Sequence, residues 1–323
     1  MNQKNMRKCL LSLLLVLFFC SCDKKSKVEK IVEEIPVEIK VERFDQAFFE
    51  TKPENLLQLK QKYPLFFPQG TEDAVWIEKM QHLQWRELYQ EVQKKYKNFD
   101  PVAADIATLF KHIKFYFPKI KNPKVVTLIG EMDYNTKTIY ADSLVLVSLE
   151  LYLGKQHRFY QFPEYIKQNF EQNQIVPDIA SSFLQSKIPP ATDKAFLSQM
   201  IAFGKELYVK ELLLPDFSEA DIMGYTAAQQ NWCLENEGYI WRYFIDKEML
   251  YSVDAKLIPR FISPAPFSKF YLEIDNDSPG QVGAWIGWQM VRSYMKNNDS
   301  SLEAMLAMSA KEIFEKSKYK PKK

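Results

Sequence analysis

The stretch NDSPGQVGAWIGWQMVRSYM, residues 276–295, carries the strongest helix signals in the 323-residue chain. Ser278 is a suitable N-cap residue, Pro279 suits the first helical position, and Gln281 stands three residues after the cap. These three positions together predict that a helix opens at Ser278.

Three glycines interrupt this predicted helix, and glycine inside a helix costs about 1 kcal/mol relative to alanine. Gly280 lies in the first turn, and Gly283 and Gly287 lie four residues apart on one face. A strip of this kind predicts that another backbone crosses closely there. An interaction groove for a partner is the alternative. The predicted packing or interaction surface comprises Gly283, Gly287, Trp285, Trp288 and Arg292.

Two further helices are predicted upstream of this stretch. The first begins near Asp193, a possible cap, and ends before Pro215. The second opens with a capping box formed by Thr226 and Gln229, and it contains Glu237 at its centre. Residues 72–96 have apolar positions at approximately helical spacing, so a helix is predicted there as well.

Glu237 is unusual because it shares a helix face with Cys233, Trp241 and Phe244. A carboxylate on an aromatic face costs free energy unless another group pairs with it. We therefore interpret Glu237 as a paired structural carboxylate or as the remnant of a former site. Its candidate partners are Lys205, Lys269 and Arg292.

The order of a short sheet, a helix and a helix with an acidic residue is typical of zincin-type metalloproteases. Such enzymes need two histidines four residues apart on a helix. The only histidines are His82, His112 and His157, and no two have that spacing. We therefore expect no catalytic residue, metal or cofactor, and we interpret Cys233 as an inert core thiol. The acidic residues of EIDNDSPG, residues 273–280, indicate either weak calcium binding or a helix flank, and the second interpretation is favoured.

The remaining pattern predicts an α+β fold that is mainly helical, with many helices around a small sheet. VEIKVERF, residues 37–44, alternates as a half-buried strand does. KVVTLIG and TKTIYAD, residues 124–130 and 136–142, predict a hairpin or two neighbouring strands. SLVLVSLELYL, residues 143–153, is compatible with either strand or helix.

The N-terminus predicts a lipoprotein signal peptide over residues 1–21. Three basic residues precede a short apolar run, which is too short to span a membrane. The run ends at Phe19-Cys20-Ser21-Cys22, which resembles a bacterial lipobox. We therefore predict that Cys22 is the lipidated first residue of the mature chain. An uncleaved anchor is the alternative.

Residues 22–34 are then predicted to be a lipidated tether, and residues 35–323 a single α+β domain. Removal of the signal peptide changes the formal net charge from +2 to −1. A body that is close to neutral does not favour nucleic acid as a partner. The basic tail KSKYKPKK, residues 316–323, is interpreted as a frayed, solvated end.

Several long segments resemble the gliding motility lipoprotein GldB family of the Bacteroidetes. The resemblance rests on residues 41–49, 149–165, 195–216, 225–252, 264–295 and 313–323, and it extends over nearly the whole mature chain. The family is distantly similar to predicted zinc-dependent peptidases, from which this sequence departs because it lacks the histidine pair.

The resemblance implies a membrane-anchored lipoprotein that faces the periplasm and is needed for gliding over surfaces. It also implies association with the gliding and type IX secretion machinery. Two hypotheses follow: a non-enzymatic component that works through protein contacts, and a hydrolase with an unrecognised or degenerate site. The sequence leaves open which membrane, inner or outer, holds the anchor.

Overall fold

The computed structural model describes residues 26–322, and it divides the chain into units of residues 1–36 and 37–323. The described part of the first unit contains helix α2 (Lys27–Glu33), which Ser26 caps by accepting a hydrogen bond from the backbone N–H of Glu29. The segment predicted to be a tether therefore contains a short helix. The predicted signal peptide and Cys22 lie outside the described residues.

The second unit is built around one four-stranded mixed sheet with the order β1-β2-β4-β3. Strands β1 and β2 are parallel, β2 and β4 are parallel, and β3 is antiparallel to β4. The two central strands are rich in branched side chains and are mostly buried, as strands covered on both faces require. The strands are β1 (Lys40–Arg43), β2 (Lys124–Leu128), β3 (Thr138–Ala141) and β4 (Leu144–Ser148).

The predicted pairing of residues 124–130 with residues 136–142 is wrong. Strands β2 and β3 do exist, but β4 lies between them and forms the hairpin with β3. The segment that was compatible with strand or helix is β4, followed by the 3₁₀ helix η5 (Leu149–Leu151). The alternation of exposed and half-buried positions in β3 suits an edge, whereas β4 is buried enough for the centre.

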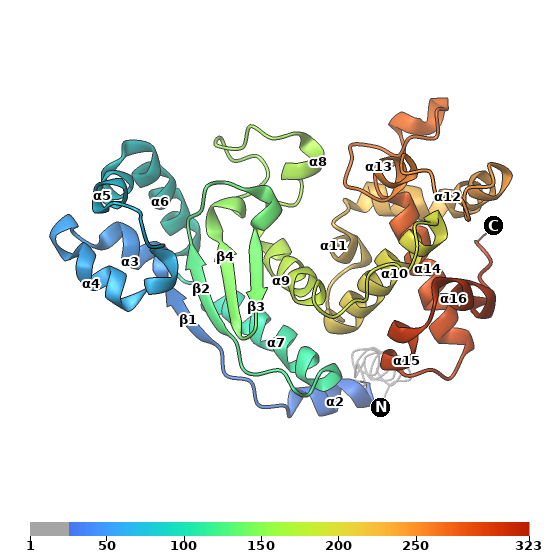
Figure 1. Ribbon diagram of the computed structural model, residues 1–323, viewed down its shortest axis with the longest axis horizontal. Helices are drawn as coiled ribbons and strands as arrows, with labels where there is room; N and C mark the ends of the chain where they lie inside the picture. Colours follow the sequence, from blue (N-terminus) through green and yellow to red (C-terminus); the bar gives the residue numbers. More distant parts are fainter. Residues whose placement is uncertain (1–25, 323) are drawn as a thin grey trace, which may run out of the picture. The chain divides into compact units, whose positions relative to one another are not determined.

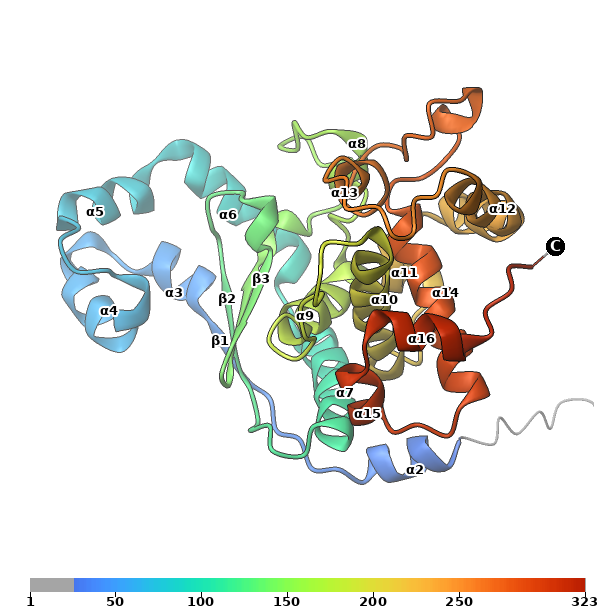
Figure 2. The same ribbon diagram turned by 45° about the vertical axis from the view of Figure 1, so that its right-hand side comes forward.

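The described chain contains fifteen α-helices, and 58% of it is helical, so the predicted α+β class with mainly helical content is confirmed. The resemblance to zincin-type proteases is not confirmed. Figure 1 shows α3–α6 on one side of the sheet and α10–α16 on the other, and Figure 2 agrees. The helices of the second unit are α3 (Phe44–Glu50), α4 (Leu56–Lys62), α5 (Asp73–Gln81), α6 (Leu83–Tyr96), α7 (Asp100–Tyr116), α8 (Glu164–Lys167), α9 (Ile175–Leu184), α10 (Phe196–Leu213), α11 (Glu219–Met223), α12 (Ala227–Asp246), α13 (Leu257–Phe261), α14 (Val282–Asn297), α15 (Leu302–Ala307) and α16 (Ala310–Ser317).

Residues 72–96 form two helices rather than one. His82 has an extended backbone and separates α5 from α6. The break allows Trp76 of α5 to pack against Phe67, while Tyr89 of α6 stacks on Phe49. Leu83, the first residue of α6, is exposed although it is apolar.

The predicted helix start at Ser278 is also wrong, because α14 begins at Val282. The Ser278 hydroxyl instead donates hydrogen bonds to backbone carbonyls of Ser268 and Asp275. A Cβ on Gly280 would lie 2.3 Å from the carbonyl oxygen of Ala265, so the backbone of residues 278–281 is held against that loop. Gln281, with φ of 62°, then turns the chain into the helix.

The upstream helices agree better with the sequence. The capping box of Thr226 and Gln229 is present at the start of α12. Helix α10 ends before Pro215, as predicted, but Asp193 is not its cap. The Asp193 carboxylate instead accepts a hydrogen bond from the backbone N–H of Ala195, the residue before the helix.

Candidate functional site

The glycines of α14 lie where α10 crosses it, and these two helices make the most extensive contact between elements of the fold. A Cβ on Gly287 would lie 1.8 Å from the carbonyl oxygen of Met200, and one on Gly204 would lie 2.3 Å from the backbone of Gly287. Real side-chain carbons cannot approach backbone atoms so closely. The crossing therefore depends on a glycine in each helix.

Gly283 faces a different neighbour from Gly287, although the two were expected to face the same one. A Cβ there would lie 2.9 Å from the carbonyl oxygen of Phe261, in α13. Trp285 and Trp288 are fully buried beside these glycines. The predicted surface is therefore covered by other helices of the same chain, and it offers no open groove.

Arg292 completes this contact through a polar group on α10. Its guanidinium binds Glu211 with two hydrogen bonds, of 2.8 and 2.9 Å. The same carboxylate accepts a hydrogen bond of 2.9 Å from the indole N–H of Trp288, and a second ion pair joins Arg292 to Glu219 at 2.8 Å. Arg292 therefore binds α10 and α11, and it is not the partner of Glu237.

Glu237 is 4% exposed, and its carboxylate accepts a hydrogen bond of 2.8 Å from the hydroxyl of Tyr319. Burial and this carboxylate raise the pKa of the Tyr319 hydroxyl. All three predicted partners of Glu237 are wrong: Lys205 donates to the backbone carbonyls of Leu306 and Met308, and no ion pair joins Glu237 to Lys269 or Arg292 within residues 26–322.

The basic tail is not frayed, because residues up to 322 pack along α12. The ring of Trp241 meets that of Tyr319 edge to face, at 5.4 Å between centroids. A Cβ on Gly238 would lie 3.2 Å from the carbonyl oxygen of Lys322. Glu237 and Gly238 together form the place where the C-terminal segment docks. The periodicity of α12 placed Glu237 on the buried face but could not identify its partner.

The other residues considered for chemistry are dispersed. Cys233 is fully buried, and burial raises its pKa. His112 lies in α7, while His82 and His157 lie in two separate loops, and no group of three metal-ligating side chains could hold an ion in the part of the chain that is described. The Asp275 carboxylate accepts hydrogen bonds from the backbone N–H groups of residues 270–272.

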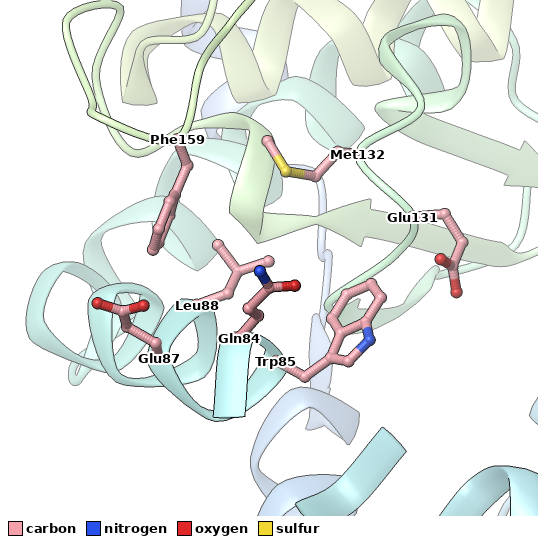
Figure 3. Close-up of a pocket in the computed structure, with 7 residues that line it drawn as sticks. All are labelled: Gln84, Trp85, Glu87, Leu88, Glu131, Met132 and Phe159. Atoms are coloured by element: carbon pink, nitrogen blue, oxygen red, sulfur yellow. The ribbon is translucent and has the colours of Figure 1, made fainter. Parts of the chain in front are cut away.

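An open pocket of about 400 Å³ lies at the start of α6. Figure 3 shows Trp85 and Phe159 on opposite sides of it, with Leu88 and Gln84 between them. Three segments that are distant in sequence supply its walls: α6, the loop after β2, and the loop before α8. The lining residues are Gln84, Trp85, Glu87, Leu88, Glu131, Met132 and Phe159.

Each aromatic wall of this pocket is held by a cation and a carboxylate. The Lys79 ammonium lies 4.1 Å from the centre of the Trp85 ring and 2.5 Å from the Glu131 carboxylate.

The second wall repeats this arrangement. The Arg158 guanidinium lies 4.3 Å from the centre of the Phe159 ring and 2.6 Å from the Glu87 carboxylate. Neither Lys79 nor Arg158 lines the pocket, whereas the carboxylates of Glu131 and Glu87 do. Each aromatic wall is therefore flanked by an ion pair.

A buried carboxyl group supports the wall formed by the loop after β2. Glu150, in η5, is fully buried and accepts a hydrogen bond of 2.9 Å from the backbone N–H of Gly130. Its other oxygen has no partner. Burial raises the pKa of Glu150 to about 7, although the N–H groups of Gly130 and Met132 favour the charged form. Met132 has a φ of 54°, a conformation that a side chain adopts only when its surroundings impose it.

This site was not predicted, although the amino-acid sequence contains two features that indicate it. One acidic residue, Glu150, stands inside the apolar run 143–153, where an unpaired carboxyl group is costly. EMDYN, residues 131–135, directly follows a buried strand, and the carboxyl ends of parallel strands commonly border ligand sites. The convergence of Trp85 and Phe159 from distant segments had no local signal.

The fold and this site define an α+β protein with a small mixed sheet, many helices and a pocket with aromatic walls at the start of α6. A family model described as gliding motility protein GldB matches residues 25–321, so the chain belongs to this family of gliding motility lipoproteins. No curated protein and no solved structure matches the chain. Within residues 26–322, none of the helices is long and apolar enough to cross a membrane.

Proposed function

We propose that this chain is a lipid-anchored component of the gliding machinery that works without enzymatic activity, through contacts with other proteins. The observation that carries the proposal is the family match over nearly the whole chain. The N-terminal sequence supports anchoring by a lipid on Cys22, with the body facing the periplasm. Association with the type IX secretion machinery is part of the same proposal.

Lipid labelling in cells tests the anchor. Cys22→Ala should abolish incorporation of a labelled fatty acid and leave an unprocessed precursor, because the thioether forms on that sulfur. Cys20→Ala is the matched control, and it should retain most of the label. Label that persists on the Cys22→Ala chain would contradict the proposed anchor.

Gene deletion and crosslinking in cells test the role. Loss of the chain should stop gliding, and the full-length protein should restore it. Crosslinking followed by purification in detergent should recover proteins of the gliding or secretion machinery in stoichiometric amounts. Unimpaired gliding after deletion would overturn the proposal.

A further inference from the structure

We propose that the pocket at the start of α6 binds a neutral aromatic side chain, of the tryptophan or tyrosine type, presented by another polypeptide. The inference rests on the proposed function, because a protein that works through protein contacts needs such anchor sites. It assigns that role to one place on the molecule.

The geometry of the walls selects a flat group. Trp85 and Phe159 lie on opposite sides of the pocket, and Leu88 lies between them (Figure 3). Aromatic rings pack favourably when they are offset or edge to face, at centroid separations of about 4.5–7 Å. A flat group that enters between these two walls has aromatic surface on two sides, with Leu88 between them.

The charges around the walls disfavour a cationic guest. A cation prefers the negative face of an aromatic ring, but Trp85 already has the Lys79 ammonium beside it, and Phe159 has the Arg158 guanidinium. Each of these cations is paired with a carboxylate, so a second cation would lose its hydration here without gaining a free counterion. The carboxylates of Glu87 and Glu131 give little compensation, because each is paired with one of these cations.

The pocket is also lined by a polar side chain. The exposed Gln84 amide lies between the two rings in Figure 3. An indole N–H or a phenol O–H can bond to such an amide, which a phenyl ring cannot do. The pocket is open rather than enclosed, so a side chain can enter while its backbone stays outside.

The rim offers further apolar surface for the partner chain. Leu83 is 80% exposed, and it lies one helical turn before Glu87, on the same face of α6. Exposed leucines are common, but this one directly precedes Gln84, which lines the pocket. A partner whose aromatic residue fills the pocket would cover Leu83 with its neighbouring residues.

Fluorine NMR of the full-length protein, labelled with fluorotryptophan and held in lipid nanodiscs, tests the binding. N-acetyl-tryptophan amide should shift the Trp85 resonance, assigned with Trp85→Phe, with a Kd on the order of 0.1–1 mM. N-acetyl-lysine amide at the same concentrations should leave it unchanged. Absence of any shift, or an equal response to the lysine amide, would overturn the inference.

Two variants and one further probe make this test specific. Phe159→Ala should weaken binding at least tenfold, and Gln84→Phe, at an exposed position, should block the pocket with its own ring. Thermal melts check that both variants stay folded. Binding of free indole without binding of the capped amino acid would identify a small-molecule pocket and overturn the polypeptide source.

Gliding assays separate this inference from the proposed function. Phe159→Ala and Gln84→Phe should impair gliding, whereas Tyr251→Ala, at an exposed aromatic residue outside the pocket, should not. If deletion of the chain stops gliding but both pocket variants glide normally, the pocket inference fails and the proposed function stands. If deletion leaves gliding intact, the proposed function itself fails.

Discussion

At the scale of single residues, the buried carboxyl group of Glu150 should lower the stability of the fold at neutral pH. Its pKa of about 7 lies above the value of 4.5 for an exposed glutamate. Between these values the unfolded chain releases its proton while the folded chain retains it. The stability of the fold therefore falls as pH rises from 4.5 to 7, by roughly 3 kcal/mol from this group, and the loss persists at higher pH.

Glu150→Gln should remove this pH dependence, because the amide does not titrate and its oxygen can still accept from Gly130. Relative to the unmodified protein, the free energy of unfolding of the variant should rise by roughly 3 kcal/mol between pH 4.5 and pH 8. Urea denaturation at both pH values measures the difference. Glu303→Gln, at an exposed position, is the control. A difference that does not change with pH would contradict the raised pKa.

The hydrogen bond between Tyr319 and Glu237 gives a second prediction at this scale. Tyr319→Phe leaves a buried carboxylate without its donor, which should cost about 1–3 kcal/mol of stability. Glu237→Gln should cost less, because the amide oxygen can accept the same hydrogen bond. Tyr251→Phe, at a residue that is 62% exposed, should cost almost nothing.

Chemical denaturation of the three variants ranks these effects. If Tyr319→Phe is as stable as Tyr251→Phe, the C-terminal segment frays in solution and Glu237 has no partner. The prediction therefore also tests whether the basic tail belongs to the folded body.

At the scale of elements, the crossing of α10 and α14 depends on the absence of side chains. Gly287→Val should lower the free energy of unfolding by about 1–3 kcal/mol or more, because its Cβ would overlap the carbonyl of Met200. This loss should exceed any gain from replacing glycine in a helix. Lys296→Val, at an exposed position of the same helix, controls for the branched side chain. Thermal melts compare the two variants, and equal melting temperatures would show that the helices separate at little cost.

At the scale of the whole molecule, the three histidines lie in one helix and two separate loops, so we expect no structural or catalytic zinc. Elemental analysis of the purified full-length protein should find far less than one zinc ion per chain. Dialysis against a chelator should leave its melting temperature unchanged. Stoichiometric zinc, or proteolysis that is lost with chelator and restored by zinc, would instead favour the hydrolase hypothesis.

Features that depend on neighbours along the chain were predictable from the amino-acid sequence alone. The capping box at Thr226, the helical face that buries Glu237 and the branched residues of β2 and β4 are local patterns, and the structure contains all of them. The mainly helical α+β class follows from the sum of such patterns. The glycines of α14 likewise predicted a close approach of another backbone.

Contacts between residues that are distant in sequence could be identified only from the tertiary structure. The true partner of Glu237 is 82 positions away, and the helix that crosses Gly287 is marked only by Gly204, a glycine that sequence reasoning passed over. Helix α14 begins at Val282 rather than at the predicted Ser278, because Gly280 packs against a separate loop. The pocket depends on α6 and two loops folding against one another. Local propensity contains no information about these contacts, because they exist only once the whole chain has folded.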